Sequence, residues 1–99
     1  MPRIKELVRI ATLERHFQEG LVSAVEILDD GERWSVCVRY NERAEGAKTR
    51  FLTSQRLPGA RRFANLSTVW KALSKHGIEA TVLRKATAEE RRHLRQSQA

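Results

Sequence analysis

The feature that most constrains the fold of this chain is a pair of strand-like segments joined by an Asp-Gly turn. The turn sequence DDGE is flanked by LVSAVEIL (21–28) and RWSVCVRY (33–40), and Asp-Gly is a preferred pair in tight hairpin turns. If Asp30 and Gly31 form a two-residue loop, one face of the hairpin is almost wholly apolar. The pairs facing each other on that side are Ile27 with Trp34, Val25 with Val36, Ser23 with Val38 and Leu21 with Tyr40. The sequence therefore predicts an antiparallel hairpin over residues 21–41.

Residues 3–18 are predicted to form a helix with an unusually wide apolar side. Pro2 is tolerated at the start of a helix, and Gly20 favours its end. The apolar residues cover more than half of the circumference, which is wider than the stripe that a surface helix needs. The helix therefore either packs on two sides within one small domain or contacts another subunit. The residues assigned to a homodimer or partner contact are Leu7, Ile10, Leu13 and Phe17.

A third strand and a second helix follow the hairpin. TRFLTSQ (49–55) has strand character, and we expect Phe51 on its core face and Leu52 on its outward face. The second helix, residues 66–76, begins at Asn65, which is a good N-cap. Its expected buried stripe consists of Leu66, Val69, Trp70 and Leu73.

The C-terminal part begins where Gly77 ends the second helix. IEATVLR (78–84) is predicted as a fourth strand. Thr87 and Glu90 form a capping box that starts a last polar helix, Ala88 to about Gln96. Because Leu94 is its only large apolar residue, we expect this helix to fray or to await a partner.

These elements give the order α-β-β-β-α-β-α. The expected fold class is α+β, with an antiparallel three-stranded meander packed by helices. A chain of 99 residues has the size of one domain. We expect a single α+β domain over residues 1–85 and a C-terminal polar helix or tail over residues 86–99.

The sequence carries no motif for catalysis, for a metal or for a cofactor. The three histidines fall on different predicted helices, and none pairs with another His or Cys at metal-ligand spacing. No Gly-rich phosphate loop or GxSxG motif is present. Cys37, the only cysteine, falls within a strand without a nearby His. The absence of these motifs predicts a protein that is not an enzyme and binds no metal or cofactor. Packing in the core is the preferred interpretation of Trp34, Tyr40 and Trp70, which argues against recognition of single strands.

The N-terminal segment and the hydropathy favour a cytoplasmic location. No apolar run approaches the roughly 18 residues that a membrane span requires. Glu6, Arg9 and Glu14 interrupt the segment in which a signal peptide would have its apolar core. A single cysteine also fits a reducing compartment.

Positive charge is concentrated in one part of the chain. The formal net charge is +7, and no acidic residue lies between Glu45 and Glu79. A segregated positive field points to a polyanionic partner, for which nucleic acid, and duplex DNA in particular, is the preferred interpretation. An acidic protein partner and a solvated basic face without a partner are the alternatives. The candidate nucleic-acid-binding residues are Lys48, Arg50, Arg56, Arg61, Arg62, Lys71 and Lys75.

Three segments resemble the small ParC-type partition-associated proteins of plasmids and integrative elements: MPRIKELVRIATLE, LVSAVEIL and RRFANLSTVWKALSKHGI. The family pattern is a short helix, a hairpin and an Arg-Arg-Phe-x-x-Leu helix that ends in Gly-Ile, and the resemblance covers residues 1–80. It implies a non-enzymatic bacterial accessory role in DNA partition or mobile-element maintenance, without catalytic residues. One alternative is a module that binds a partition or regulatory protein through its apolar first helix. Duplex RNA binding is a third interpretation, because the α-β-β-β-α order also resembles the double-stranded RNA-binding domain.

Overall fold

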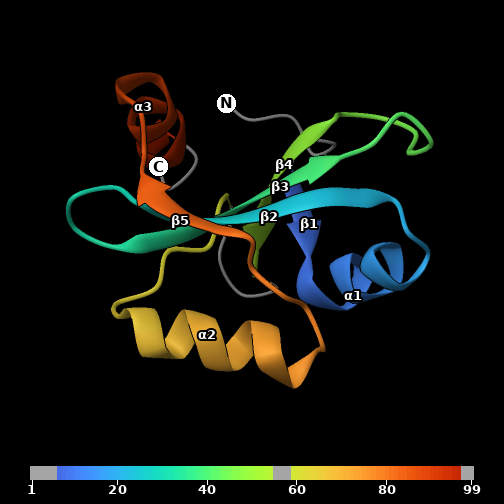
Figure 1. The fold of residues 1–99 in the computed structure, drawn as a ribbon. Helices are drawn as coiled ribbons and strands as arrows, with labels where there is room; N and C mark the ends of the chain where they lie inside the picture. The colour runs from blue at the N-terminus through green and yellow to red at the C-terminus, as the bar shows by residue number, and fades with distance from the viewer. Residues whose placement is uncertain (1–6, 55–58, 97–99) are drawn as a thin grey trace.

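The computed structural model describes residues 7–54 and 59–96 and is built around a five-stranded sheet in the order β1-β4-β3-β2-β5 (Figure 1). Strands β2, β3 and β4 form an antiparallel meander, and β1 and β5 add a parallel strand at each edge. The α+β class and the central meander are therefore confirmed. The elements are β1 Leu7–Arg9, α1 Ile10–Gln18, β2 Val22–Asp29, β3 Trp34–Tyr40, β4 Thr49–Thr53, α2 Leu66–Lys75, β5 Val82–Lys85 and α3 Ala88–Gln96.

The hairpin of β2 and β3 forms as expected, but in a register shifted by two residues. Ile27 pairs with Val36, where the two-residue loop predicted Trp34. The turn is longer because the carboxylate of Asp30 accepts hydrogen bonds from the backbone N–H groups of Glu32 and Arg33. A shift of two residues preserves the alternation of side chains, so the predicted apolar face survives the wrong register.

The predicted helix over residues 3–18 is wrong in its first half. Leu7–Arg9 forms strand β1, which runs parallel to β4 and pairs Val8 with Leu52. Only Ile10–Gln18 is helical, and residues 3–6 lie outside the described part of the chain. The predicted helix had a wide apolar side because it combined a strand, whose side chains alternate every two residues, with a helix, whose side chains repeat every 3.6 residues.

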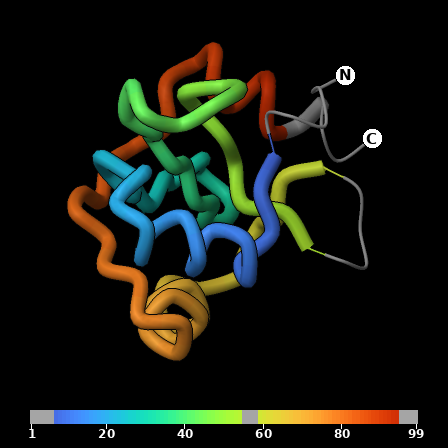
Figure 2. Tube along the Cα trace, turned by 90° about the vertical axis from the view of Figure 1, so that its right-hand side faces the viewer, coloured from blue at the N-terminus to red at the C-terminus, as the bar shows by residue number. Residues whose placement is uncertain are grey.

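Helices lie on both faces of the sheet (Figures 1 and 2). Each face has its own apolar cluster. The face that packs against α1 and α2 is called the first face, and the face that packs against α3 is called the second face. The first-face cluster includes Val8, Leu13, Val25, Ile27, Val36, Val38, Leu52, Phe63, Val69, Leu73 and Ile78. The second-face cluster consists of Leu28, Cys37, Phe51, Ala60, Ala86 and Leu94. Figure 2 also shows β1 and β5 at opposite edges of the sheet.

Strand β4 presents its residues to the opposite faces from those expected. Phe51 pairs with Cys37 across the strands, so both side chains lie on the second face. Leu52, predicted to point outward, is fully buried on the first face. The outward assignment was wrong because it assumed that only one face of the sheet is covered.

Helix α2 has both predicted caps. The Asn65 side chain accepts a hydrogen bond from the Thr68 N–H at 2.9 Å. At the other end Gly77 has φ +68, and the Ile78 N–H donates to the Leu73 carbonyl at 2.9 Å, which is the Schellman arrangement. One predicted core position is wrong, because the side chain of Trp70 is 58% exposed.

Helix α3 is also capped as predicted, but it does not await a partner. The Glu90 N–H donates to Thr87 Oγ1 at 3.1 Å, and the Thr87 N–H donates to Glu90 Oε1 at 2.9 Å. Leu94 is fully buried in the second-face cluster. Leu94, the ion pair between Glu90 and Arg84 and the contact between the His93 and Phe51 rings together attach this helix to the sheet. Among the described residues, no helix is long and apolar enough to cross a bilayer.

Candidate nucleic-acid surface and apolar groove

Arg62 lies in an ion-pair cluster at the β2–β3 turn. Its Nε lies 2.9 Å from Asp30 Oδ2 and its Nη2 lies 3.5 Å from Glu32 Oε2, and its side chain is only 13% exposed. Burial opposes ionisation of Asp30, but hydrogen bonds from Arg62 and from the backbone of Arg33 and Glu32 outweigh it and lower its pKa. The turn acids therefore neutralise the charge of Arg62 within the chain.

Lys48 and Arg50 lie together near the β3–β4 loop. The Arg50 guanidinium lies 4.0 Å from the centroid of the Tyr40 ring, and its Nε donates to the Ala47 carbonyl at 2.9 Å. Lys48 Nζ donates to the carbonyl of Ala44. Contacts within the chain therefore hold both side chains in place.

Arg61 lies beside β4. Its guanidinium lies 4.3 Å from the centroid of the Phe63 ring, and its backbone N–H donates to the Leu52 carbonyl at 2.6 Å. The remaining candidate of this region, Arg56, lies outside the described residues.

Lys71 and Lys75 are exposed one turn apart on α2. The helix LSTVWKALSK contains no acidic residue. Its buried residues are Val69 and Leu73, so the two lysines lie on the opposite, outward side. The predicted cations are thus divided among the β2–β3 turn, the β3–β4 region, the flank of β4 and α2.

The residues assigned to a dimer or partner contact all pack within the chain. Leu13 is fully buried, and Ile10 and Phe17 pack partly buried against the first-face cluster. Leu7 packs partly buried against the second-face cluster. The surplus apolar surface that led us to expect a homodimer is therefore covered by the chain itself.

An apolar groove between α2 and β5 is the main surface feature that the sequence did not predict. The large hydrophobic side chains that are exposed in the described part of the chain are Trp70 at 58%, Val82 at 42% and Leu83 at 54%, and all three border this groove. Its volume is about 550 Å³. The other lining residues are Ile27, Leu66, Ser67, Ala80 and Thr81.

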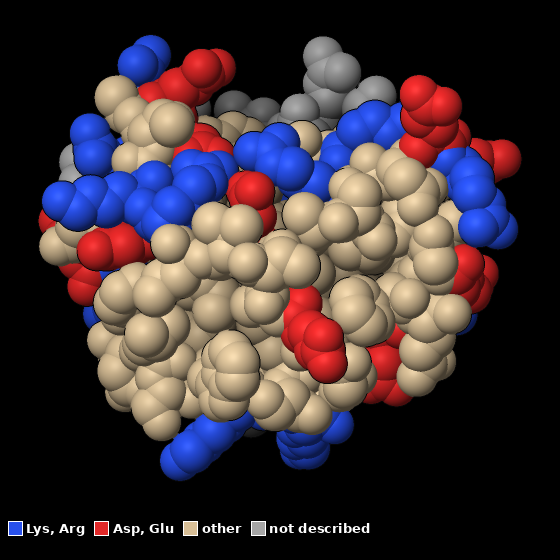
Figure 3. Space-filling model, in the orientation of Figure 1, with Lys and Arg blue, Asp and Glu red and all other residues tan. Residues whose placement is uncertain are grey.

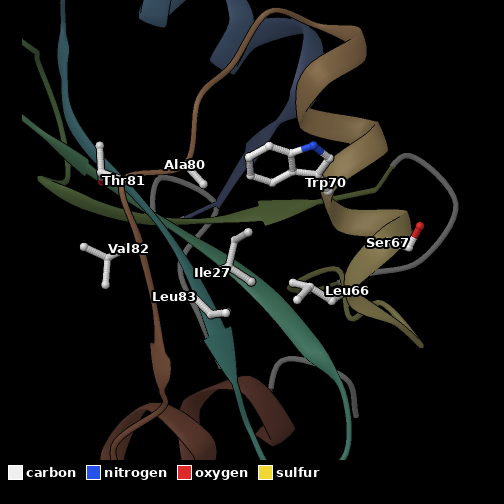
Figure 4. Close-up of a pocket in the computed structure, with 8 residues that line it drawn as sticks. All are labelled: Ile27, Leu66, Ser67, Trp70, Ala80, Thr81, Val82 and Leu83. Atoms are coloured by element: carbon white, nitrogen blue, oxygen red, sulfur yellow. The ribbon is translucent and has the colours of Figure 1, made fainter.

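Residues from three elements surround the groove (Figure 4). The indole of Trp70 extends from α2 toward Ala80, and Leu83 points toward Ile27 of β2. Val82 points away from α2, as strand alternation requires. Thr81 fixes the entry into β5, because its Oγ1 donates to the Val25 carbonyl at 3.0 Å and accepts from the Val25 N–H at 3.2 Å.

Charged and uncharged surfaces are separated on the side of the molecule that faces the viewer in Figure 1. Figure 3 shows a band of lysine and arginine side chains, with acidic side chains among them, above a broad area that is mostly uncharged and contains a few acidic side chains. Further cationic side chains project below this area, where α2 lies. On this side, cationic side chains therefore lie above and below an area that is mostly uncharged.

An ion-pair network on the second face joins β3, β2, β5 and α3. Glu26 Oε1 lies 3.2 Å from Arg39 Nε and 3.0 Å from Arg84 Nη2. Arg84 Nη1 lies 2.8 Å from Glu90 Oε1. The hydrogen bonds from Arg84 lower the pKa of Glu90 to about 2 against its burial. These cations are assigned to holding the fold together rather than to an external ligand.

Two histidines make contacts between elements. His16 Nδ1 lies 2.9 Å from the Tyr40 hydroxyl, beside a second hollow of about 330 Å³ that Arg50 also borders. Burial lowers the pKa of His16, and Arg50 adds to this effect. His76 ends α2, and its Nδ1 lies 2.6 Å from Glu14 Oε1 of α1.

Neither a metal centre nor a reactive thiol is formed by the described residues. They include no group of three or more His, Cys, Asp or Glu side chains placed to hold a metal ion. Cys37 is buried, and its burial raises the pKa of the thiol to about 11. A thiol with this pKa is a weak nucleophile near neutral pH.

Comparison with protein-family models, with curated proteins and with solved structures finds no match to this chain. The resemblance to partition-associated proteins therefore rests on the sequence segments quoted above. The outward side of α2 and the groove beside it are the surfaces from which a function is argued.

Proposed function

We propose that this chain is a non-enzymatic DNA-binding accessory protein that contacts the duplex backbone with the outward side of α2. The observation that carries this proposal is an exposed helical surface without acids, on which Lys71 and Lys75 lie one turn apart. Exposed polar side chains surround them: Asn65, Ser67, Thr68 and Ser74. Lysines, hydroxyl and amide side chains are usual donors to phosphate oxygens.

The overall charge supports the same proposal. A formal net charge of +7 attracts a polyanion over distances longer than a contact. We assign binding mainly to phosphate contacts, because α2 lacks the Arg and Gln side chains that most often read base edges. A cytoplasmic role in plasmid or mobile-element partition or maintenance, as the sequence resemblance implies, belongs to this proposal.

The contacts of each candidate cation within the chain decide whether we assign it to DNA binding. Arg62 is assigned to the turn, because two carboxylates already pair with it. We assign the main phosphate contacts to Lys71 and Lys75. Additional phosphate contacts, which only a duplex extending past α2 would reach, are assigned to Lys48, Arg50 and Arg61.

The test is a salt titration of duplex binding with Lys71→Glu combined with Lys75→Glu. If two phosphate contacts are lost, the slope of log K against log salt should decrease by about 1.8, at about 0.9 per contact on duplex DNA. The matched control is Arg43→Glu combined with Arg92→Glu, which changes the net charge equally at exposed positions away from α2. We expect this control to keep the wild-type slope.

The same titration tests the alternatives. Preferred binding to duplex RNA at equal salt would favour the RNA interpretation. An equal decrease in slope for both double variants would contradict a contact centred on α2. Absence of duplex binding by the wild-type protein at low salt would reject the proposal. Capture of a protein by the first helix is not favoured, because Leu13 and its neighbours are packed in the core.

A further inference from the structure

We propose that the groove between α2 and β5 binds an extended segment of a partner protein, with alternating apolar and acidic residues, which adds to the sheet as a strand beside β5. This site adjoins the outward side of α2 to which DNA binding is assigned, and the two share Ser67 and Lys71. The inference combines the open strand edge, the apolar groove and the positive charge around it.

The first step is the strand edge. In the described part of the chain, β5 pairs only with β2, and it is the last strand in the order. The Ala86 N–H donates to the Asp29 carbonyl at 2.8 Å, in the register that pairs Asp29 with Lys85, so Val82 and Arg84 direct their backbone groups to β2. The backbone groups of Leu83 and Lys85 are therefore directed to the open side. An unprotected edge of this kind is a template for pairing with another chain.

The second step is the groove beside that edge. Side chains of an added strand would alternate, and every second one would point toward α2. There they would meet the exposed indole of Trp70 and the side chains of Leu83 and Ile27 (Figure 4). Recognition of an extended peptide by backbone pairing, with pockets for alternate side chains, is an established mode of peptide binding.

The third step is the charge of the occupant. Lys85 lies on the groove side of β5, because it alternates with Leu83. Lys71 follows the groove-lining Ser67 by one helical turn. Two acidic residues are next to lining residues in sequence: Glu79 precedes Ala80, and Glu26, which precedes Ile27, is paired with Arg39 and Arg84. Cations on both walls favour a segment whose remaining residues are Asp and Glu.

The same charges disfavour a second copy of this chain as the occupant. Each copy would bring a formal charge of +7. Pairing of two β5 edges would also place Arg84 and Lys85 of each copy near those of the other. Like charges directly opposite each other in a sheet are destabilising.

The probe is a fluorescein-labelled synthetic peptide, Asp-Val-Glu-Leu-Thr-Val-Asp, titrated by fluorescence anisotropy. We expect it to bind the wild-type protein. It should bind Trp70→Ala at least about tenfold more weakly, since a central aromatic residue usually dominates such a contact. Leu21→Ala, beside the other hollow, is the control and should bind as the wild type does. A peptide with lysine at each acidic position should bind much more weakly.

Amide NMR spectra of the complex test the added strand. New hydrogen bonds should shift the Leu83 and Lys85 N–H resonances and slow their exchange, while the Ala86 N–H, already bonded to β2, changes little.

Four outcomes would overturn the proposal: no binding of the acidic peptide, equal binding of the lysine peptide, unchanged affinity of Trp70→Ala, or a wild-type dimer that Trp70→Ala dissociates. Because duplex binding is measured separately, loss of either activity alone identifies which of the two proposals fails.

Discussion

The two faces of the central sheet are covered by different kinds of contact. The first face packs against α1 and α2 through a large apolar cluster that includes Leu13 and Leu73, both buried. The second face has a smaller apolar cluster around Leu28 and Leu94, and ion pairs tie its strands to α3. Two layers of one small domain are thus held by apolar burial on one side and largely by charge on the other.

The two faces also differ in how far apart in sequence the residues lie that reveal their contacts. The first-face helices contribute apolar residues at helical spacing, which a sequence shows directly. The second face depends on pairs such as Arg84 with Glu26, whose partners are 58 residues apart. Substitutions on the two faces should therefore respond differently to a lost side chain and to pH.

The largest effect is expected from Leu13→Ala on the first face. The side chain is fully buried, so its removal leaves a cavity and should lower the free energy of unfolding by about 2–5 kcal/mol. Urea unfolding at neutral pH measures the loss. Leu83→Ala is the control, because the same change at a side chain that is 54% exposed should cost less than about 1 kcal/mol. Equal losses would show that α1 is not part of the core.

The next largest effect is expected from Asp30→Asn at the β2–β3 turn. Asparagine keeps the oxygen that accepts the Glu32 and Arg33 N–H groups, but it removes the charge paired with Arg62. Loss of a charge partner from a nearly buried Arg should cost about 2–3 kcal/mol. Glu32→Gln is the control, since Glu32 is 66% exposed and its ion pair should contribute less than about 1 kcal/mol. A silent Asp30→Asn would mean that Arg62 is solvated and available to an external anion.

A smaller effect, with a characteristic pH dependence, is expected from Glu90→Gln on the second face. The pKa of Glu90 is lowered to about 2 in the folded protein, so its ionised form stabilises the fold above its ordinary pKa of 4.5. This contribution is lost as pH falls from about 4.5 toward 2. Because Arg84 and Glu90 are partly exposed, we expect a difference from wild type of about 1–2 kcal/mol at pH 7.

Urea unfolding between neutral and acidic pH tests this expectation for Glu90. Glutamine keeps an oxygen for the Thr87 N–H, so the helix cap is preserved and only the charge is tested. The two proteins should converge as the pH falls. A difference that stays constant with pH would assign the effect to packing instead of to the Arg84 pair.

Elements with local end signals were predictable from the sequence. Helix α2 has Asn65 at its start and Gly77 at its end, and α3 begins with Thr87 and Glu90, and all four act as expected. The alternation of the hairpin was also sufficient to identify its apolar face. These signals involve neighbours within a few residues, so they do not depend on the rest of the fold.

Elements that depend on distant partners were not predictable. Strand β1 is only three residues long, and it exists because β4 lies beside it. We predicted Arg62 as a phosphate contact from its charge. The sequence does not show that Asp30 Oδ2 lies 2.9 Å from Arg62 Nε. The sequence therefore identifies the cations, but it does not show which of them are already paired within the chain.

The smallest effect is expected from Trp70→Ala, although helical spacing placed this residue in the core of the first face. A buried tryptophan would cost about 3–5 kcal/mol on truncation. With its side chain 58% exposed, Trp70 should instead cost no more than about 1 kcal/mol in urea unfolding followed by circular dichroism. Leu73→Ala on the same helix is the matched control and should show the core value, because Leu73 is buried. If Trp70→Ala is as costly as Leu73→Ala, the indole belongs to the first-face core and the groove beside β5 is closed. If the cost is small, the exposed indole contributes little to folding, and it remains accessible to the partner segment that we propose for the groove.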